Sequence, residues 1–235
     1  MLVIWDFDGV ICDSDGIWAQ NWCDLLESEK GIILSASEKQ RLLIGISERD
    51  KVKRLEAFFD GLRIDDDFKR KLNEKHDYGM KNLLVLMPGV EDIFADKRFI
   101  QCIATGGNSY QNFTKNHTVG IDKYFNAKNC FTADMVQKGK PDPEIFLLAA
   151  QRMNVPIDEC VVVEDSPDGL TAAKKAGMKA FAFVGAAANN TPEYRERCRE
   201  LGADGIFDTM SALYRGLEQF AAELEQNSDT KKEKR

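Results

Sequence analysis

Two aspartates near the amino terminus, Asp6 and Asp8, are the first residues whose type and spacing suit catalysis. They follow the apolar run Leu2–Trp5, and a short apolar run bounded by turn residues predicts a buried strand of a parallel sheet. Ligands of open α/β sheets bind outside the carboxyl ends of the strands, where both side chains would lie. Two carboxylates so close repel each other unless a cation lies between them or one takes up a proton, and both states serve catalysis. Taken alone, the pair would also fit an acidic turn or a fragment of a calcium loop.

Three later segments supply further polar residues in a fixed order. They are IATGGN at residues 103–108, KGKPDP at residues 138–143 and VVVEDSPDG at residues 161–169. The chain therefore presents a carboxylate pair, a hydroxyl, a lysine and a second carboxylate pair. This order and these strings resemble the four motifs of the haloacid dehalogenase superfamily, and specifically its phosphatase and β-phosphoglucomutase-like branch. The resemblance covers nearly the whole chain and implies a Rossmann-like core with an inserted helical cap.

The resemblance implies a phosphate-monoester hydrolase with named roles for three side chains. Such a site needs charge neutralisation, an in-line nucleophile and a proton for the leaving oxygen. Asp6 can attack phosphorus and form an aspartyl phosphate. Asp8 can protonate the leaving oxygen and then deprotonate the water that hydrolyses the intermediate. Lys140 matches the lysine of the third motif, which neutralises phosphate charge and shields Asp6, whereas Lys138 fits a solvated surface charge.

The resemblance also implies a Mg²⁺ site. Mg²⁺ is held by one or two carboxylates, waters and a substrate phosphate oxygen. The expected protein ligands are Asp6, the backbone carbonyl of Asp8, and Asp165 with Glu164 beside it; whether Glu164 binds the metal directly stays open. In isolation, the second acidic pair would fit a helix N-cap ahead of Pro167, but Asp6 needs a metal partner.

We expect Thr105, Gly106 and Asn108, together with Lys140, to bind the phosphate and the substrate. The Thr105 hydroxyl can donate to phosphate, and the glycines after it expose backbone N–H groups at a strand-to-helix turn, which is a ready anion site. The chain's two histidines have no acid or nucleophile within sequence reach, and we predict a surface or packing role for each.

The leading hypothesis is a Mg²⁺-dependent phosphatase acting on a small phosphorylated metabolite, such as a sugar or sugar-acid phosphate. The alternative is a β-phosphoglucomutase-type isomerase on the same scaffold. In those mutases a cap-hinge histidine stands five residues after the aspartate that matches Asp13, and this chain has Trp18 there. An indole N–H can donate a hydrogen bond but cannot accept one or take up a proton. Asn108 also stands where the mutases have a lysine that meets the second phosphate, and both departures favour hydrolysis.

Three further readings are disfavoured by the same residues. A haloacid dehalogenase needs neither Asp8 nor a metal. A phosphonatase needs a cap lysine that forms a Schiff base, and no lysine matches its position. A non-catalytic binding protein would not need the complete set of motif residues required for turnover. This chain has all of them, which disfavours that reading.

The rest of the sequence predicts the elements that position these residues. Residues 15–82 carry apolar residues at helical spacing without a strand pattern, which predicts a small helical bundle. A bundle inserted just after the first strand resembles the helical cap of the family. The second cap helix is predicted to start with a capping box at Ser37 and Gln40 and to end at Gly45, and the third to start at Ser47. After residue 88 strands and helices alternate, which is typical of a parallel sheet with helices on both faces. Strands are predicted at residues 99–104, 130–132, 160–163, 179–184 and 205–207.

We therefore predict an α/β fold with two structural units. The Rossmann-like core comprises residues 1–14 and 83–225, and the all-helical cap comprises residues 15–82. The polar segment 226–235 is predicted to be a disordered tail.

Charge and composition limit the partners. The 235 residues include 32 basic and 39 acidic side chains, for a net charge of -7, which argues against a general nucleic-acid or anionic-membrane role. No apolar run approaches the roughly 18 residues of a membrane span, and the amino terminus lacks the basic region of a signal peptide. The six cysteines have no metal-ligand spacing, which predicts reduced thiols in a cytoplasmic protein. The expected partner is a small phosphorylated metabolite, with no nucleic acid and no membrane, and the expected state is a monomer or weak dimer.

Overall fold

A six-stranded parallel sheet forms the centre of the molecule. The computed structural model describes residues 1–235 except 45, 47, 187–189 and 234–235. The strands are β1 (Leu2–Trp5), β2 (Ile100–Ala104), β3 (Cys130–Phe131), β4 (Cys160–Glu164), β5 (Lys179–Phe183) and β6 (Gly205–Phe207). Their spatial order is β3-β2-β1-β4-β5-β6, so β1 lies between β2 and β4. The strand order reverses beside β1, and this is where α/β sheets of this kind bind ligands.

Both faces of the sheet are covered, because successive strand residues point to opposite sides. Val3 and Trp5 belong to one core, which packs against α5 (Val90–Ala95) and α10 (Met210–Glu233). Leu2 and Ile4 belong to the second core, which packs against α7 (Glu144–Met153), α8 (Pro167–Lys175) and α9 (Pro192–Glu200). The remaining core elements are α6 (Ser109–Thr118) and two short 3₁₀ helices, η1 (Ala133–Met135) and η2 (Ile157–Glu159). The predicted α/β fold is confirmed.

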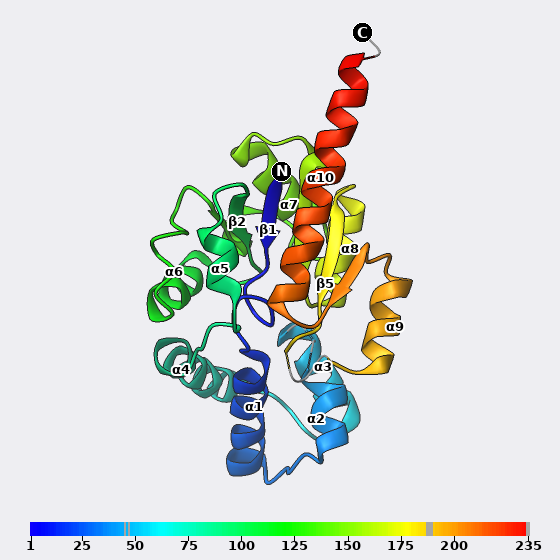
Figure 1. Ribbon diagram of the computed structural model, residues 1–235. Coiled ribbons are helices and arrows are strands. Elements are labelled where there is room, and N and C mark those ends of the chain that lie inside the picture. Colours follow the sequence, from blue (N-terminus) through cyan, green and yellow to red (C-terminus); the bar gives the residue numbers. More distant parts are fainter. Residues whose placement is uncertain (45, 47, 187–189, 234–235) are drawn as a thin grey trace.

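Four helices between β1 and α5 form the cap. They are α1 (Asp15–Lys30), α2 (Ala36–Leu42), α3 (Glu48–Phe58) and α4 (Asp66–Asn82). Their inward side chains form a third hydrophobic core of their own, which includes Trp22, Leu26 and Phe68. Figure 1 shows the cap facing the carboxyl ends of the strands. We keep the division after residues 14 and 82 as a proposal, since α1 begins at Asp15 and α4 ends at Asn82.

A polar contact ties the cap to the core beside the sheet edge. The hydroxyl of Tyr110, on α6, donates to Asp77 Oδ1 of α4 at 2.7 Å. The Lys81 ammonium donates to the other oxygen of Asp77 at 2.6 Å. The cap is therefore held to the core by α4 as well as by the two connecting segments.

The start of α2 differs from the prediction. Ser35, and not Ser37, is the N-cap: the Glu38 N–H donates to Ser35 Oγ at 3.3 Å, and the Ser35 N–H donates to the Glu38 carboxylate at 2.8 Å. An ionised carboxylate accepts a stronger hydrogen bond than the neutral amide of Gln40, which explains why this register wins. The limits expected at Gly45 and Ser47 lie outside the described residues.

The prediction of a disordered tail at residues 226–235 was wrong as far as Glu233, because α10 continues to that residue. The first turns of α10 are anchored by the buried Leu213 and Leu217. Once a helix is nucleated, each further residue adds one hydrogen bond at little cost, and Gln, Lys and Glu are good helix formers. Its last turns extend past the body of the molecule in Figure 1.

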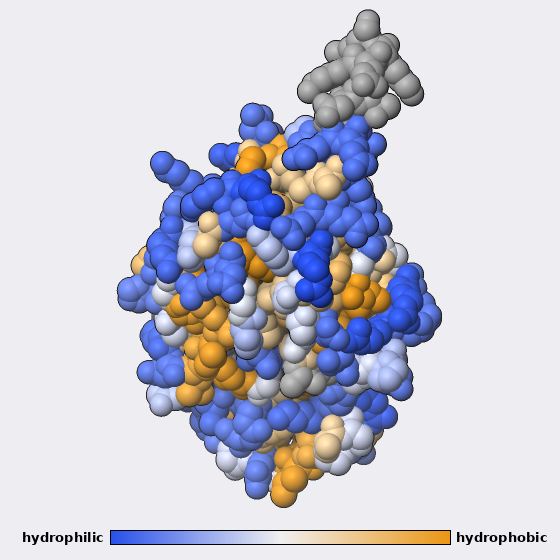
Figure 2. Space-filling model, viewed as in Figure 1, coloured by the Kyte–Doolittle hydropathy of each residue, from blue (hydrophilic) through white to orange (hydrophobic). Residues whose placement is uncertain are grey.

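The surface is mostly hydrophilic in the view of Figure 2, in keeping with the acidic composition. Hydrophobic surface gathers near α6 and the segment that joins α4 to α5, where Leu83, Val85 and Phe113 are exposed. No helix within the described ranges is long and apolar enough to cross a membrane. All six cysteines are free thiols, as predicted. The cytoplasmic location and the monomeric or weakly dimeric state stay predictions.

Candidate active site

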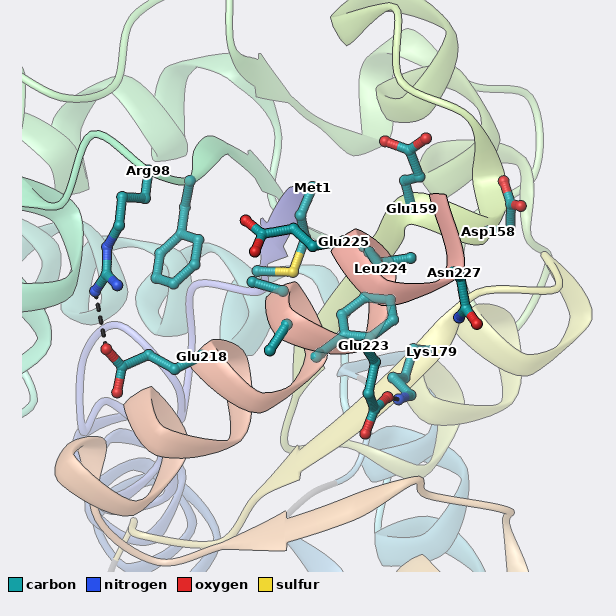
Figure 3. A pocket seen from close by; sticks show the side chains of 14 residues that line it. Met1, Arg98, Asp158, Glu159, Lys179, Glu218, Glu223, Leu224, Glu225 and Asn227 are labelled. Carbon is teal, nitrogen blue, oxygen red and sulfur yellow. Dashed lines mark hydrogen bonds and ion pairs between the residues drawn. The ribbon is translucent and has the colours of Figure 1, made fainter. Parts of the chain in front are cut away.

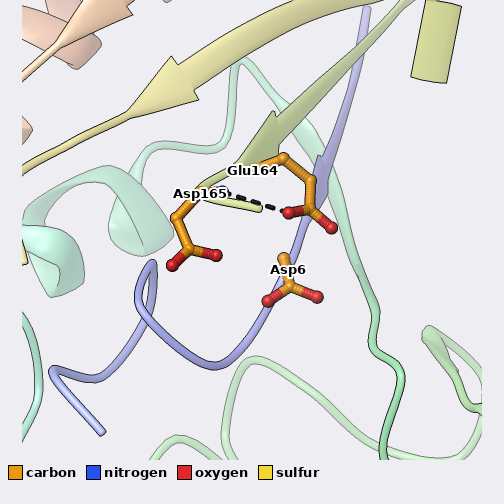
Figure 4. A group of neighbouring side chains, drawn as sticks. All are labelled: Asp6, Glu164 and Asp165. Atoms are coloured by element: carbon orange, nitrogen blue, oxygen red, sulfur yellow. Dashed lines mark hydrogen bonds between the residues drawn. The ribbon is translucent and has the colours of Figure 1, made fainter. Parts of the chain in front are cut away.

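Three carboxylates meet where the chain leaves β1 and β4. Asp6 follows β1, Glu164 ends β4 and Asp165 comes next. Because β1 and β4 are paired neighbours, their carboxyl ends bring these side chains together. One oxygen from each carboxylate lies within 4.8 Å of the other two, and none of the three residues is more than 7% exposed. Figure 4 shows Glu164 and Asp165 with their carboxyl groups on the side of Asp6.

Lys140 is the cation of this cluster. Its Nζ donates to Asp6 Oδ1 at 2.6 Å, to Glu164 Oε1, and to the carbonyl of Ala104 at 3.1 Å. These three acceptors match the three donors of an ammonium group, so the position of the side chain is fixed. Lys138, which the sequence assigned to the surface, is exposed.

Glu164 has donors at both of its oxygens. Besides Lys140 at Oε1, its Oε2 accepts from the Asp165 N–H at 3.1 Å and from the N–H and hydroxyl of Ser166, both at 2.9 Å. A Cβ at Gly169 would lie 1.9 Å from the Glu164 carboxyl group, so only glycine fits against it. These contacts favour Glu164 as the residue that orients Lys140, with Asp6 and Asp165 as the direct carboxylate ligands of a metal ion.

The cluster carries more negative charge than its lysine balances. Burial raises the pKa of Asp6 to about 7, with a further contribution from the charge of Glu164 and an opposing one from Lys140. Burial also raises the pKa of Asp165 well above its usual value, and Asp15 and Glu164 add to the effect. Burial lowers the pKa of Lys140, but the charges of Asp6 and Glu164 outweigh it and raise the pKa overall. A second cation would relieve this repulsion.

The donor set and the backbone fit Mg²⁺. Buried carboxylate oxygens are the hard ligands that this ion prefers. Gly9, with φ of +76°, lets the loop after β1 pass close to Asp165, and a Cβ there would lie 1.9 Å from Asp165 Oδ2. Asp6 and Asp165, with Glu164 beside them, could therefore hold this ion, and the metal site stays a prediction.

We expect the metal-free protein to lose stability as the pH rises from about 4 to about 7. A carboxyl group whose pKa is higher in the folded state binds more protons folded than unfolded, so the free energy of unfolding falls between the two pKa values. For Asp6 these are 3.8 and about 7, and Asp165 shifts in the same direction. Each pKa unit is worth about 1.4 kcal/mol.

Thermal unfolding in excess chelator, at pH of about 5.5 and about 7.5, measures this effect as a lower Tm at the higher pH. Asp6→Asn removes one titrating group and should weaken the dependence, whereas Asp92→Asn, at an exposed aspartate on α5, should leave it unchanged. Mg²⁺ should raise the Tm more at the higher pH. A Tm in chelator that increases over this range would contradict the assignment.

Asp8 lies apart from the carboxylate cluster and has its own donors. The Ser14 hydroxyl and the Trp18 indole N–H donate to Oδ1 at 2.7 and 3.0 Å, and Lys115 Nζ donates to Oδ2 at 2.5 Å. Burial raises the pKa of Asp8, but the Lys115 charge and these hydrogen bonds outweigh it and lower the pKa overall. The side chain of Asp8 therefore lies outside the carboxylate cluster, and a metal role would fall to its backbone carbonyl.

The segment after β2 forms another wall of the site. Thr105, which is 2% exposed, accepts a hydrogen bond from the Gly107 N–H at 3.2 Å, and both residues line the cavity together with Gly106. Asn108 does not line it; its Oδ1 accepts from the Gln111 N–H at 2.9 Å and caps α6. The contact of Asn108 with the substrate stays a prediction, and Gln111 lies in the wall.

A cavity of about 710 Å³ between core and cap contains the motif side chains. Its core wall includes Asp6, Asp8, Thr105, Lys140 and Asp165, and its cap wall includes Asp15, Trp18, Asp50, Lys51, Arg54 and His76. The ring of His76 makes an edge contact with Trp18 at a centroid distance of 5.2 Å, so this histidine packs as predicted but also borders the site. His117 is exposed beside Asp122, as predicted.

A larger cavity, of about 890 Å³, lies at the opposite end of the sheet against α10, and Figure 3 shows its lining. Its cations Arg98 and Lys179 are paired with Glu218 and Glu223 at 2.9 and 2.7 Å. Because acidic side chains already neutralise these cations, this cavity does not favour an anionic ligand. The smaller cavity is the candidate active site.

Lys115 contacts Asp8 directly and was missed by the sequence reasoning. It lies on α6, whose buried residues are Asn112, Lys115 and Asn116 and include no apolar side chain. Positions i, i+3 and i+4 of a helix share one face, so a helix with a polar inward face was the available signal. Because a polar helix face usually points to solvent, this pattern could not identify Lys115 before the fold was known.

Fold, motif order and site together define a haloacid dehalogenase-type phosphatase. Residues 1–177 match the model of the haloacid dehalogenase-like hydrolases, and the chain belongs to that family.

Among its relatives is the phosphorylated carbohydrates phosphatase of Thermotoga maritima, 31% identical over 75% of this chain and 82% of the relative. A putative phosphatase of Bacillus subtilis is 30% identical over 75% of this chain and 80% of the relative. A haloacid dehalogenase-like protein of unknown function from Agrobacterium tumefaciens has a similar structure, with a TM-score of 0.83, 28% identity, and coverage of 94% of this chain and 98% of that chain. A putative β-phosphoglucomutase from Thermotoga maritima is also similar, with a TM-score of 0.70, 28% identity, and coverage of 96% and 99%.

Proposed function

We propose that this phosphatase hydrolyses a small phosphorylated metabolite, a sugar or sugar-acid phosphate, with Mg²⁺ and through an aspartyl phosphate on Asp6. The observation that carries the proposal is the contact of Lys140 with both Asp6 and Glu164, beside Asp165, in the cavity between core and cap. This arrangement combines a nucleophile, a phosphate-neutralising cation and a metal centre within one small volume.

Each side chain then has one task. Lys140 and the backbone of residues 105–107 bind the transferring phosphoryl group and balance its charge. Asp6 attacks phosphorus, and Asp8 donates a proton to the leaving oxygen. Asp8 then accepts a proton from the water that hydrolyses the aspartyl phosphate. Mg²⁺ bound by Asp6 and Asp165 would supply charge neutralisation for the phosphoryl oxygens.

The choice of a sugar phosphate rests on the relatives and on the polar cap wall. The Thermotoga maritima relative acts on phosphorylated carbohydrates by its name, and a 62-residue segment is 48% identical to a fructose-1-phosphate phosphatase of Escherichia coli. The cap wall carries Asp50, Lys51 and Arg54, whose polar groups suit a hydroxylated, anionic substrate.

The second candidate is a β-phosphoglucomutase-type isomerase, because a putative member of that group has a similar fold. A mutase must keep water away from its phospho-enzyme until a sugar arrives. Trp18 donates its N–H to Asp8 but cannot carry a proton, so it cannot replace the hinge histidine of the mutases. This difference favours hydrolysis.

A panel of phosphorylated metabolites, assayed for inorganic phosphate with Mg²⁺ and with excess chelator, tests the proposal. We expect release from sugar or sugar-acid phosphates with Mg²⁺ only, and inhibition by Ca²⁺. Ca²⁺ takes six to eight ligands at longer distances and would displace Asp6 from its in-line position. Full activity in chelator would revive the dehalogenase interpretation.

The same assay separates the hydrolase from the isomerase. With β-glucose 1-phosphate we expect negligible formation of glucose 6-phosphate. Interconversion that is faster than phosphate release would overturn the hydrolase assignment.

A further inference from the structure

Asp6 and Asp8 each have a lysine of their own. Lys140 contacts Asp6 and Glu164, whereas Lys115 contacts Asp8. Within the described residues, Asp8 is the carboxylate that pairs with Lys115. No motif accounts for Lys115, which is the seventh residue of α6 and lies 107 residues from Asp8 in sequence.

Lys115 is held rigidly. Only 5% of the residue is exposed, although lysine is among the residues least often buried. Its ammonium lies 5.1 Å from the centroid of the Phe7 ring and 5.4 Å from that of Trp18, within the range of cation–π attraction. The two rings and Asp8 confine the ammonium, so its direction toward Asp8 Oδ2 is fixed.

The three donors to Asp8 come from different parts of the chain. Ser14 precedes α1 at the junction with the cap, and Trp18 lies on α1 within the cap. Lys115 alone among these donors lies on a helix of the core, the unit that also carries Asp6. The Lys115 contact therefore ties Asp8 Oδ2 to the unit that carries Asp6, although the Trp18 ring of the cap borders the same ammonium group.

We propose that Lys115 is a positioning residue that holds the Asp8 carboxyl group where it protonates the leaving oxygen. The proposal rests on the proposed phosphatase function. Proton delivery requires hydrogen-bond reach of the leaving oxygen, and an aspartate free to rotate meets that geometry only part of the time. Without Lys115, Asp8 keeps its donors at Oδ1 but loses the one at Oδ2.

Leaving-group dependence is the readout that a purely structural role would not change. Phenyl phosphate and p-nitrophenyl phosphate differ only in the para nitro group, but phenolate is the more basic leaving group and depends more on a proton from Asp8. The value of kcat/KM reports only the steps up to departure of the phenolate, so the later hydrolysis of the aspartyl phosphate does not enter.

We would measure kcat/KM for both esters with the full-length Mg²⁺-loaded wild type, Lys115→Met and, as a matched control, Lys138→Met at the exposed lysine. General acid catalysis typically contributes ~10²–10⁴-fold, and mispositioning loses part of it. We expect Lys115→Met to lower kcat/KM about tenfold or more for phenyl phosphate and less than about threefold for p-nitrophenyl phosphate. Lys138→Met should change neither value.

Equal losses for the two esters, or no loss for either, would overturn the positioning role. If Lys115→Met does not give the circular dichroism spectrum of the wild type, Lys115→Gln is measured in the same way. If neither variant folds, Lys115 is a residue of the fold and the proposal is rejected. Failure of the phosphatase function itself would look different, because the wild type would then release no phenol from either ester.

Discussion

Asp6→Asn is expected to abolish phosphate release while leaving the fold intact. The Asp6 carboxylate is the proposed nucleophile, and an amide of the same shape cannot form the acyl phosphate. The fold should survive because the substitution removes a buried charge, and Lys140 keeps Glu164 as its ionic partner. Phosphate release in Mg²⁺, with circular dichroism as the check on folding, measures the outcome.

Asp92→Asn is the matched control for this variant, since it makes the same chemical change at an exposed aspartate of the core. It should retain wild-type activity. Near-normal turnover by a well-folded Asp6→Asn protein would remove the covalent mechanism altogether.

For Asp8→Asn we expect a different defect, with loss of at least the roughly 10²–10⁴-fold that a general acid and base contributes. An asparagine can still accept hydrogen bonds from Ser14 and Trp18, so the local structure has reason to persist. A good leaving group such as p-nitrophenolate needs little protonation, but hydrolysis of the aspartyl phosphate still needs a base. The phospho-enzyme should therefore accumulate with this substrate.

Mass spectrometry of the intact protein after mixing with p-nitrophenyl phosphate detects the phosphoryl adduct. Asp6→Asn gives the blank, because it has no carboxylate to phosphorylate. Equal impairment of both steps, with no adduct from any substrate, would argue against the dual role of Asp8.

Local sequence patterns were sufficient for the order of strands and helices and for the residues at the strand ends. The apolar runs before Asp6, Thr105 and Glu164 predicted parallel strands, and a parallel sheet necessarily brings neighbouring carboxyl ends to one edge. Helical spacing in residues 15–82 likewise predicted a helical bundle, which the resemblance to the family identified as a cap. These predictions depend on contacts between neighbours in sequence, which is why one chain without its structure could supply them.

Where the sequence contained two local alternatives, the pattern alone did not identify the one that the structure uses. Ser35 and Ser37 are both plausible N-caps, and the structure uses the one whose partner is the carboxylate of Glu38. The sequence analysis considered Asn108 only as a substrate ligand, and the structure shows that its side chain caps α6. The polar segment after residue 225 was expected to be disordered, but the packed turns before it extend the helix to Glu233.

The sequence by itself determined the α/β fold with its cap, the motif order, and Asp6, Asp8, Lys140 and Asp165 as the candidate chemical groups. Only the tertiary structure decided that Lys140 links Asp6 to Glu164, that Lys115 contacts Asp8, and that the cap wall carries Lys51 and Arg54. Those contacts join residues on elements distant in sequence, and no spacing rule encodes them. A charged group that is buried at low dielectric constant is costly unless it is paired. The packing of α6 and the cap against the sheet determines which partner is within reach of each charge.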